Sequence, residues 1–143
     1  MRFTKELSIN AAPEKVFAYV ADLTRHPEWA NHKLKIEASS DAPLGVGSKF
    51  NSVGHQMGME SHDEVTVVTY EPLQRFAYEA KSKDGRFRHL IELRPDGSAT
   101  RVTKSMEVVE ASLGTKLMTP LIFLMAPGVL SKDLRRIKAR LEQ

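Results

Sequence analysis

Apolar and polar residues alternate one by one through the middle of the chain, and this period of two is typical of strands with one buried face. The opening residues show it first, because Phe3, Leu7 and Ile9 fall on one face of an extended run that ends near Asn10. The breaks between later runs contain glycine or proline, and two of them end in Asp-Gly, which favours a hairpin turn. The pattern predicts further strands over residues 33–38, 48–55, 59–70, 74–80, 86–94 and 99–110.

A helical period replaces this alternation near the amino end. Pro13 suits the first helical position, and apolar residues between Val16 and Leu23 recur at helical spacing. Proline disfavours helical geometry in the residue before it and cannot continue a helix smoothly. A break is therefore predicted at His26-Pro27, with one further helical turn around Trp29.

After Glu110 the helical period returns and holds to the end of the sequence. The terminal helix is predicted to begin at Pro120 with Thr119 as its cap, or earlier, near Gly114, and Pro127 is expected to kink it. Its apolar face consists of Leu130, Leu134, Ile137 and Leu141, opposite basic residues at positions 132, 135, 136 and 140.

These elements predict an α+β fold in which one long helix covers the apolar face of a seven-stranded antiparallel sheet. A helix is about 10 to 12 Å across with its side chains, whereas seven strands spaced ~4.8 Å apart span about 30 Å. The sheet is therefore expected to curl around the carboxyl-terminal helix and to leave a cavity where the two do not touch. One domain, residues 1–143, accounts for all of these elements.

Composition narrows the chemistry. The sequence has no cysteine, which excludes thiol nucleophiles, disulfides and thiolate metal sites. A net charge of +3 is too small to indicate a nucleic-acid-binding protein. The amino terminus alternates like a strand and has no signal-peptide pattern, so a cytoplasmic location is expected. The longest apolar run, residues 117–130, is too short for stable membrane insertion, and it is expected to belong to the core.

The histidines give no indication of a metal site. The chain has five of them, and they show neither the short spacings of metal ligands nor an HExxH motif. They are His26, His32, His55, His62 and His89. We therefore expect neither a metal nor a cofactor.

Five segments of the chain together resemble a known superfamily. They are INAAPEKVFAYVADLTRHPEWA, GVGSKF, YEPLQRFAYEA, DGSATRVTKSMEV and the closing LRRIKARLE. Nearly the whole chain is similar to the START-like superfamily, and within it to the polyketide cyclase/dehydrase and lipid transport group, also called SRPBCC proteins. The resemblance implies a helix-grip fold, in which two short helices after the first strand close one end of a deep pocket. It implies no single function, because this superfamily includes carriers, cofactor-free cyclases, oxygenase domains and chaperone regulators.

Alternation also indicates which side chains face the inside of the curved sheet. A few polar groups among apolar ones are typical of small-molecule sites. An ionised Lys104 on this face needs a partner, and the predicted one is Asp63, although a register shifted by one residue would turn both out to solvent. Trp29 either plugs the edge of the sheet or contacts a ligand. The predicted ligand-binding residues are Trp29, Met59, Ser61, Asp63, Phe76, Tyr78, Phe87, His89, Lys104, Met106, Leu121 and Met125.

Three functions are compatible with these residues. The first is a protein that encloses a small hydrophobic or amphipathic molecule, such as a lipid, polyketide, isoprenoid or quinone. Adaptable methionines suit such a ligand, and the sequence offers Met57, Met59, Met106, Met118 and Met125. The second is a cofactor-free cyclase or dehydratase, with His89 or Asp63 as general base and Lys104 or Tyr78 polarising a carbonyl. The third is a module whose outer sheet face or basic terminal helix docks a partner protein or a membrane surface.

Overall fold

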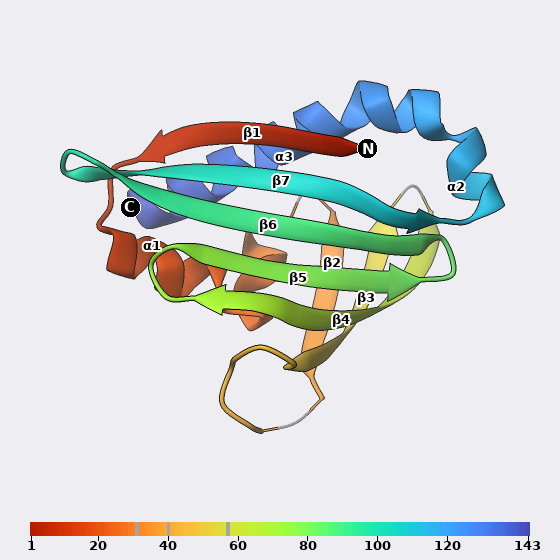
Figure 1. Cartoon of the computed structure of the whole chain (residues 1–143), viewed down its shortest axis with the longest axis horizontal. Helices are drawn as coiled ribbons and strands as arrows, with labels where there is room; N and C mark the ends of the chain where they lie inside the picture. The colour runs from red at the N-terminus through yellow and green to blue at the C-terminus, as the bar shows by residue number, and fades with distance from the viewer. Residues whose placement is uncertain (31, 40, 57) are drawn as a thin grey trace.

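Seven strands form one antiparallel sheet in the order β1-β7-β6-β5-β4-β3-β2 (Figure 1). The computed structural model describes residues 1–30, 32–39, 41–56 and 58–143, so Met57 lies outside the described residues. The strands are β1 (Arg2–Ile9), β2 (Lys33–Ala38), β3 (Lys49–Gln56), β4 (Met59–Glu71), β5 (Arg75–Ser82), β6 (Gly85–Asp96) and β7 (Ala99–Ala111). The predicted seven-stranded antiparallel sheet is confirmed, with strand ends shifted by one or two residues.

The two predicted Asp-Gly hairpins join β5 to β6 and β6 to β7. Gly97 has a φ of 63° and Gly85 a φ of 140°, and both values lie in the region that favours glycine. At Gly85 a Cβ atom would also overlap the backbone carbonyl oxygen of Glu110 on β7. The sequence therefore needs glycine here for close approach of two strands as well as for the turn.

The first helical segment breaks earlier than the sequence predicted. Helix α1 spans Pro13–Val20, and a 3-10 helix, η1, spans Leu23–Glu28 and contains Pro27. The side chain of Asp22 caps the new segment, because it accepts hydrogen bonds from the backbone N–H and the hydroxyl of Thr24. The prediction of a break at His26-Pro27 is thus wrong, since this cap starts the second segment before the proline is reached. Trp29 directly follows η1.

Both predicted starting points of the terminal helix occur to within one residue, because the segment is divided into two helices at Met118. The predicted cap, Thr119, is wrong, since Thr119 is the first helical residue of the second helix and Met118 stands at its cap. Helix α2 spans Leu113–Leu117, and the Oγ of Ser112 caps it by accepting a hydrogen bond from the Thr115 N–H at 3.2 Å. Helix α3 spans Thr119–Leu141 and contains Pro127. The predicted apolar face of α3 is confirmed, since Leu130, Leu134, Ile137 and Leu141 are all buried. No helix among the described residues is long and apolar enough to cross a membrane.

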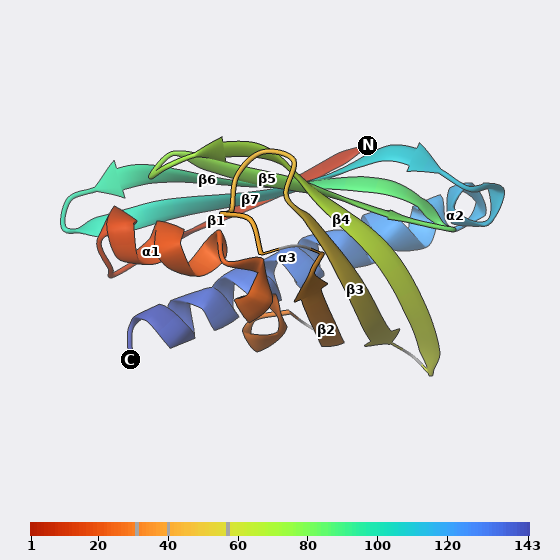
Figure 2. The same ribbon diagram turned by 90° about the horizontal axis from the view of Figure 1, so that it is seen from below.

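The sheet curves, and α1, η1 and α3 lie together on its concave side (Figure 2). The strands β2, β3 and the beginning of β4 bend away from the rest of the sheet toward the level of α3 (Figure 2). The main core lies between the sheet and the carboxyl-terminal half of α3, and it includes Phe17, Trp29, Phe76, Ile91, Val102, Leu134 and Ile137. At this end of the molecule side chains occupy the space in which the sequence predicted a cavity.

The apolar run from Leu117 to Leu130 is not the core segment that the sequence predicted. Of its residues only Ala126 and Leu130 are buried, and they pack with Phe3 in a small separate cluster. The physical reason is that α3 packs on the sheet mainly through β1 and β7, which form one edge, so the amino-terminal half of the helix has a single neighbouring surface. Periodicity marks an apolar face but does not say what will cover it.

Candidate functional site

Lys104 lies at the centre of the concave side, where β7 faces α3. Its side chain is only 2% exposed, and its Nζ lies 3.6 Å from Oδ2 of Asp133 on α3 and 5.7 Å from the centre of the Trp29 ring. Burial lowers the pKa of Lys104, and the Asp133 carboxylate offsets part of this effect by favouring the charged form. The pair therefore places one positive and one negative group inside an otherwise apolar interior.

The predicted partner of Lys104 was Asp63, and this prediction is wrong. Asp63 does lie on the inner face, on β4, but β5 and β6 separate β4 from β7 in the sheet. The partner comes instead from the helix that crosses the concave face. Burial raises the pKa of Asp63, with a further contribution from the nearby Asp84.

A row of rings extends from η1 across the sheet. Tyr78 on β5 and His89 on β6 are register partners, and their rings stack with centres 4.9 Å apart and planes 14° apart. The ring of His26, carried by η1, lies 5.9 Å from that of Tyr78 and 4.2 Å from that of Trp29. The short 3-10 helix thus brings two rings, His26 and Trp29, against the inner face of the sheet.

Both histidines in this row are held neutral. Burial lowers the pKa of His26 to about 3, and the positive charge of Lys104 adds to the effect. The pKa of His89 is also well below its ordinary value. Burial is the main cause, and the positive charge of Lys104 is the second. The opposite holds for Tyr78, because burial raises its pKa and keeps the hydroxyl protonated. At neutral pH the row therefore presents a neutral imidazole next to a phenol that can donate a hydrogen bond.

Three buried polar atoms of this row have hydrogen-bonding capacity that the described part of the chain does not use. They are Nε1 of Trp29, the hydroxyl oxygen of Tyr78 and Nδ1 of His89. A buried polar group without a partner costs about 1–3 kcal/mol, so such groups are normally satisfied by protein, water or a ligand. The atoms Trp29 Nε1–H and Tyr78 O–H are donors, and they match an acceptor such as a carbonyl or carboxylate oxygen.

Beyond His89 the inner face becomes partly exposed. Ser61 and Asp63 on β4, Phe87 on β6 and Met106 on β7 share the inward face with the core residues of their strands but are only half-buried. On α3, Met125 is exposed and lies three helical turns before Arg136, whose guanidinium donates to the Ala30 carbonyl oxygen between η1 and β2 at 2.6 Å. Met125 therefore faces the same open side.

Two polar side chains, Ser61 and His32, lie close to Gly54 at this open side. A Cβ at Gly54 would lie 3.1 Å from the Ser61 Oγ and 3.2 Å from the His32 Nε2, so the imidazole of His32 covers this glycine beside Ser61. Burial lowers the pKa of His32. The open end thus has polar groups on β4 and at His32, with apolar groups on β6, β7 and α3.

The structure brings most of the predicted site residues to one side of the sheet. Trp29, Phe76, Tyr78 and Lys104 are buried in its closed part, His89 is half-buried at the boundary, and Ser61, Asp63, Phe87 and Met106 lie in its open part. Two predicted residues lie elsewhere. Met59 is exposed where β4 begins, and Leu121 is exposed on α3, a third of a turn around the helix from Asp133.

Sequence reasoning missed His26, His32 and Asp133. Asp133 carried a usable signal, because it is the one acidic residue between Leu130 and Leu134, on the apolar stripe of the terminal helix. The two histidines carried none, since their positions follow from the path of η1 and of the chain after it. No group of three or more histidine, aspartate or glutamate residues is arranged to hold a metal within the described residues.

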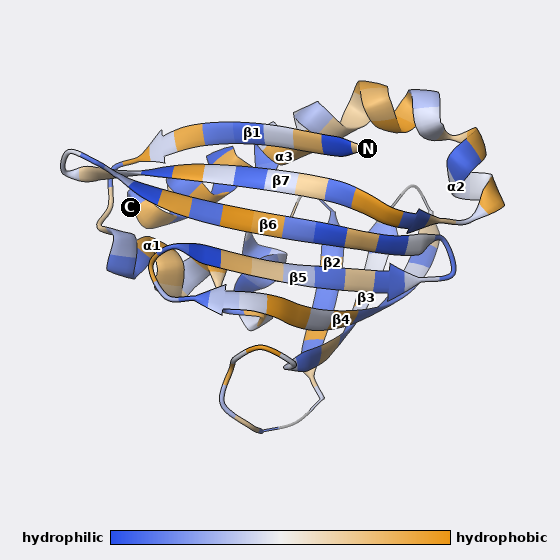
Figure 3. Cartoon of the chain, in the orientation of Figure 1, coloured by the Kyte–Doolittle hydropathy of each residue, from blue (hydrophilic) through white to orange (hydrophobic). Residues whose placement is uncertain are grey.

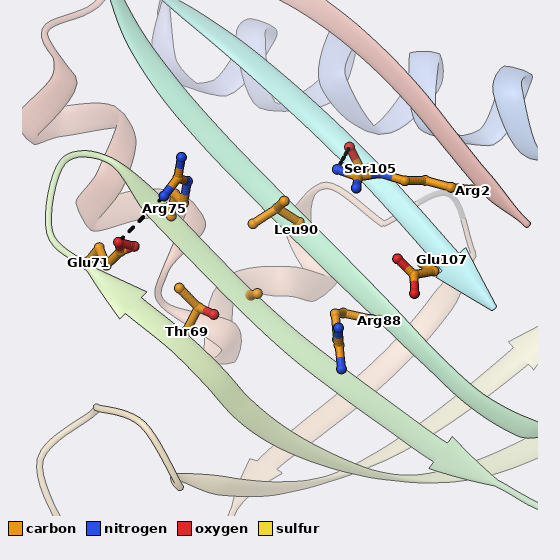
Figure 4. A pocket seen from close by; sticks show the side chains of 9 residues that line it. Arg2, Thr69, Glu71, Arg75, Arg88, Leu90, Ser105 and Glu107 are labelled. Carbon is orange, nitrogen blue, oxygen red and sulfur yellow. Dashed lines mark hydrogen bonds and ion pairs between the residues drawn. The ribbon is translucent and has the colours of Figure 1, made fainter. Parts of the chain in front are cut away.

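Two surface depressions stand apart from this inner site. The first, of about 290 Å³, lies on the outer face of the sheet and includes Arg2, Arg75, Arg88 and Leu90 (Figure 4). Arg75 and Arg88 are already paired with Glu92 and Glu79, at 3.0 and 2.8 Å, so little positive charge is free there. The second, of about 180 Å³, lies between η1 and the loop before β3. Neither depression has a wall formed by α3.

A family model described as polyketide cyclase/dehydrase and lipid transport matches residues 1–142. The chain belongs to this family. The resemblance that the sequence suggested is therefore confirmed, and the family supports a ligand-binding or polyketide cyclase fold. No curated protein sequence matches the chain significantly.

Solved structures share the fold at low sequence identity. TTHA0849 from Thermus thermophilus has a TM-score of 0.80 and 17% identity, with 99% of this chain and 97% of that protein covered. CV1439 from Chromobacterium violaceum has a TM-score of 0.76 and 15% identity, over 100% and 99% of the two chains. StfQ, a di-domain ARO/CYC from the steffimycin biosynthetic pathway, has a TM-score of 0.78 and 13% identity, over 99% of this chain and 50% of that one. These similarities confirm the helix-grip fold.

The buried ion pair leads to a prediction about stability. Lys104→Met leaves the Asp133 carboxylate buried without this cation, so the free energy of unfolding should fall by about 3–5 kcal/mol. Lys104→Met/Asp133→Leu should recover part of this loss, because both charges are removed. Urea unfolding measures the free energy of unfolding of both variants. Lys49→Met is the control, since it breaks the exposed Lys49–Glu64 pair and should cost no more than about 1 kcal/mol. Additive losses in the double variant would contradict a coupled pair.

The neutral histidines lead to a prediction about pH. His26 and His89 take up protons near pH 6.5 in the unfolded chain but only at much lower pH in the folded one. The stabilisation that this difference in pKa provides is fully present above about pH 6.5. It is lost as the pH falls toward 3, by at most ~1.4 kcal/mol per pH unit for each histidine. His26→Phe, which keeps a ring against Trp29, should make the slope shallower in urea unfolding between pH 7 and 4. Equal slopes for the variant and the natural chain would exclude His26 as a source.

Proposed function

We propose that this protein binds a small amphipathic molecule at the open end of the concave face, between β4, β6, β7 and α3. The observation that carries the proposal is the set of buried polar atoms of Trp29, Tyr78 and His89 that have no hydrogen-bond partner among the described residues, next to half-buried apolar side chains. Small-molecule sites combine a mainly apolar lining with a few convergent polar groups. In this protein the half-buried apolar side chains and the buried polar atoms are adjacent.

The arrangement favours a particular orientation of the ligand. His89 is nearest the open end, since it alternates with Phe87 on β6, and Tyr78 stacks on it from β5. An oxygen-bearing end of the ligand would therefore enter first and accept a hydrogen bond from Tyr78. The apolar remainder would contact Phe87 and Met106 on the sheet and Met125 on α3.

The comparisons favour two ligand classes. The family description covers both lipid transport and polyketide cyclisation, and StfQ is described as an ARO/CYC of a biosynthetic pathway. Fatty acids and aromatic polyketides both combine an extended apolar part with carbonyl or carboxylate oxygens. This shared chemistry is what the proposed site would recognise.

A fluorescent fatty acid tests this proposal. cis-Parinaric acid should bind the natural protein and quench the emission of Trp29, which is the only tryptophan in the chain. Met125→Lys adds a charge to the proposed apolar wall and should weaken binding at least about tenfold, because it removes a contact and makes the wall polar. Fluorescence titration measures the dissociation constant.

Val46→Lys is the matched control for this titration. Val46 is exposed in the loop between β2 and β3, away from the concave face, so its replacement should leave the affinity unchanged. Equal weakening in the two variants would show that parinaric acid binds nonspecifically to exposed apolar surface. No binding of parinaric acid or of a hydroxylated naphthalene would contradict the proposed site.

One observation favours a second function, a cofactor-free cyclase or dehydratase. Nδ1 of the neutral His89 is buried beside the protonated phenol of Tyr78, and no described residue forms a hydrogen bond with it. Such an imidazole could take a proton from the methylene between two carbonyls of a polyketide, while Tyr78 donates to the enolate oxygen. The enolate carbon would then bond to the carbon of a distant ketone, whose C=O becomes an alcohol by taking back the proton held by His89. Loss of this hydroxyl together with a hydrogen on the adjacent carbon would release water and leave a C=C bond.

Product analysis separates the two functions. If the protein is a cyclase, His89→Gln should lower kcat for an aromatic ring-closure substrate by about 10²–10⁴-fold, the usual contribution of a general base. Binding of parinaric acid should change far less. A protein that binds substrate analogues tightly but releases every one of them unchanged, in both forms, is a carrier.

A further inference from the structure

Four leucines near the start of the terminal helical segment are left uncovered by the rest of the chain. Leu113 and Leu117 on α2 are 74% and 76% exposed, and Leu124 on α3 is 79% exposed; Leu121 on α3 is also exposed. We call these four side chains the leucine row. Figure 3 shows hydrophobic residues on both α2 and the amino-terminal turns of α3. Single exposed leucines are ordinary, but four within one short segment concentrate exposed apolar surface in the way that partner-binding segments do.

The packing of α3 explains why the row stays exposed. On the side facing the sheet, Ile122 and Ala126 pack with Phe3, and Asp133 contacts Lys104. Leu121 and Leu124 lie on other sides of the same helix. No described element of the chain lies over them, so burial of the row requires a second molecule.

The charges around the row favour an anionic partner. Between Ala111 and Ser131 the sequence contains Lys116 and no acidic residue, and Lys132 and Arg135 follow on α3. The adjacent turn carries Lys83 beside Asp84, whose carbonyl oxygen accepts the Thr115 hydroxyl at 2.9 Å. Glu110, at the end of β7, is paired with Arg86 at 3.0 Å. The acidic side chains at the border of the row, Asp84 and Glu110, thus each have a basic neighbour. Within the segment of the row itself the one charged residue is Lys116, which is positive.

We propose that the leucine row docks the protein on the surface of an anionic lipid bilayer. Leucines on a short helical segment can enter the boundary between headgroups and acyl chains, and lysines at their side are attracted to anionic lipids. The apolar run is too short to span a bilayer, so the protein lies on the surface. A second copy fits less well, because a two-fold interface would bring two sets of lysines together without an acidic partner.

This docking surface is next to the proposed ligand site but does not depend on it. Met118, between α2 and α3, and Met125, which belongs to the proposed ligand site, are exposed along the same segment as the leucine row. A membrane-docked molecule would therefore present the open end of the concave face close to the lipids. The proposal itself rests on the exposed row and its charges, so it can fail while ligand binding holds, and the reverse is also true.

Vesicle flotation tests the proposal. The natural protein should float with vesicles made of three parts phosphatidylcholine to one part phosphatidylglycerol. Leu117→Glu/Leu124→Glu should reduce the bound fraction at least about tenfold, because two carboxylates replace apolar groups and repel the anionic surface. Val46→Glu alters an equally exposed apolar residue, 69% exposed, outside the row and should bind like the natural protein. Trp29 emission checks that each variant is folded.

Several outcomes would overturn the proposal. One is a natural protein that does not float with the anionic vesicles. Another is equal loss of binding in Val46→Glu and in the double variant. Equal flotation with pure phosphatidylcholine vesicles would exclude an anionic surface as the partner. Light scattering that finds a dimer, which the double variant dissociates, would assign the row to contact between two copies of the chain.

Discussion

The ion pair between Lys104 and Asp133 sets the position of the terminal helix on the sheet. It joins β7 to α3 inside the molecule, where neither charge has access to bulk water, and geometry at such a pair must be good to offset the loss of hydration. Toward the carboxyl end of α3, Leu134 and Ile137 pack into the main core and extend the contact between the helix and the sheet. The helix is thereby held along the β1–β7 edge and does not fill the concave face.

This off-centre position explains the two main features of the protein together. At the carboxyl end of α3, the helix, α1 and η1 close over the sheet and bring His26 and Trp29 against Tyr78 and His89. At the amino end the helix extends beyond its neighbours, which leaves the inner face partly exposed and the leucines of α2 and α3 uncovered. One molecule therefore combines a buried polar cluster with an open apolar side, and small-molecule sites in general combine these two features.

Much of this arrangement could be predicted from the sequence, and the limits have physical causes. The period of two fixed the strands and the inward direction of Lys104, His89 and Tyr78, because alternation is a local property of a strand. Contacts between distant elements have no such local signal, so Asp133 and His26 were missed and Asp63 was wrongly paired. The apolar run of α3 was assigned to the core because hydrophobicity alone does not distinguish a buried face from an exposed one.

The central claim is that a ligand enters the concave face and not the depression on the outer face. Nuclear magnetic resonance tests it directly, by mapping amide and indole shifts during titration with oleic acid. The account predicts that the largest changes occur at Phe87, His89 and Met106 and at the indole of Trp29, all on the concave side. Changes centred instead on Arg75, Arg88 and Leu90, with the Trp29 indole unaffected, would contradict it.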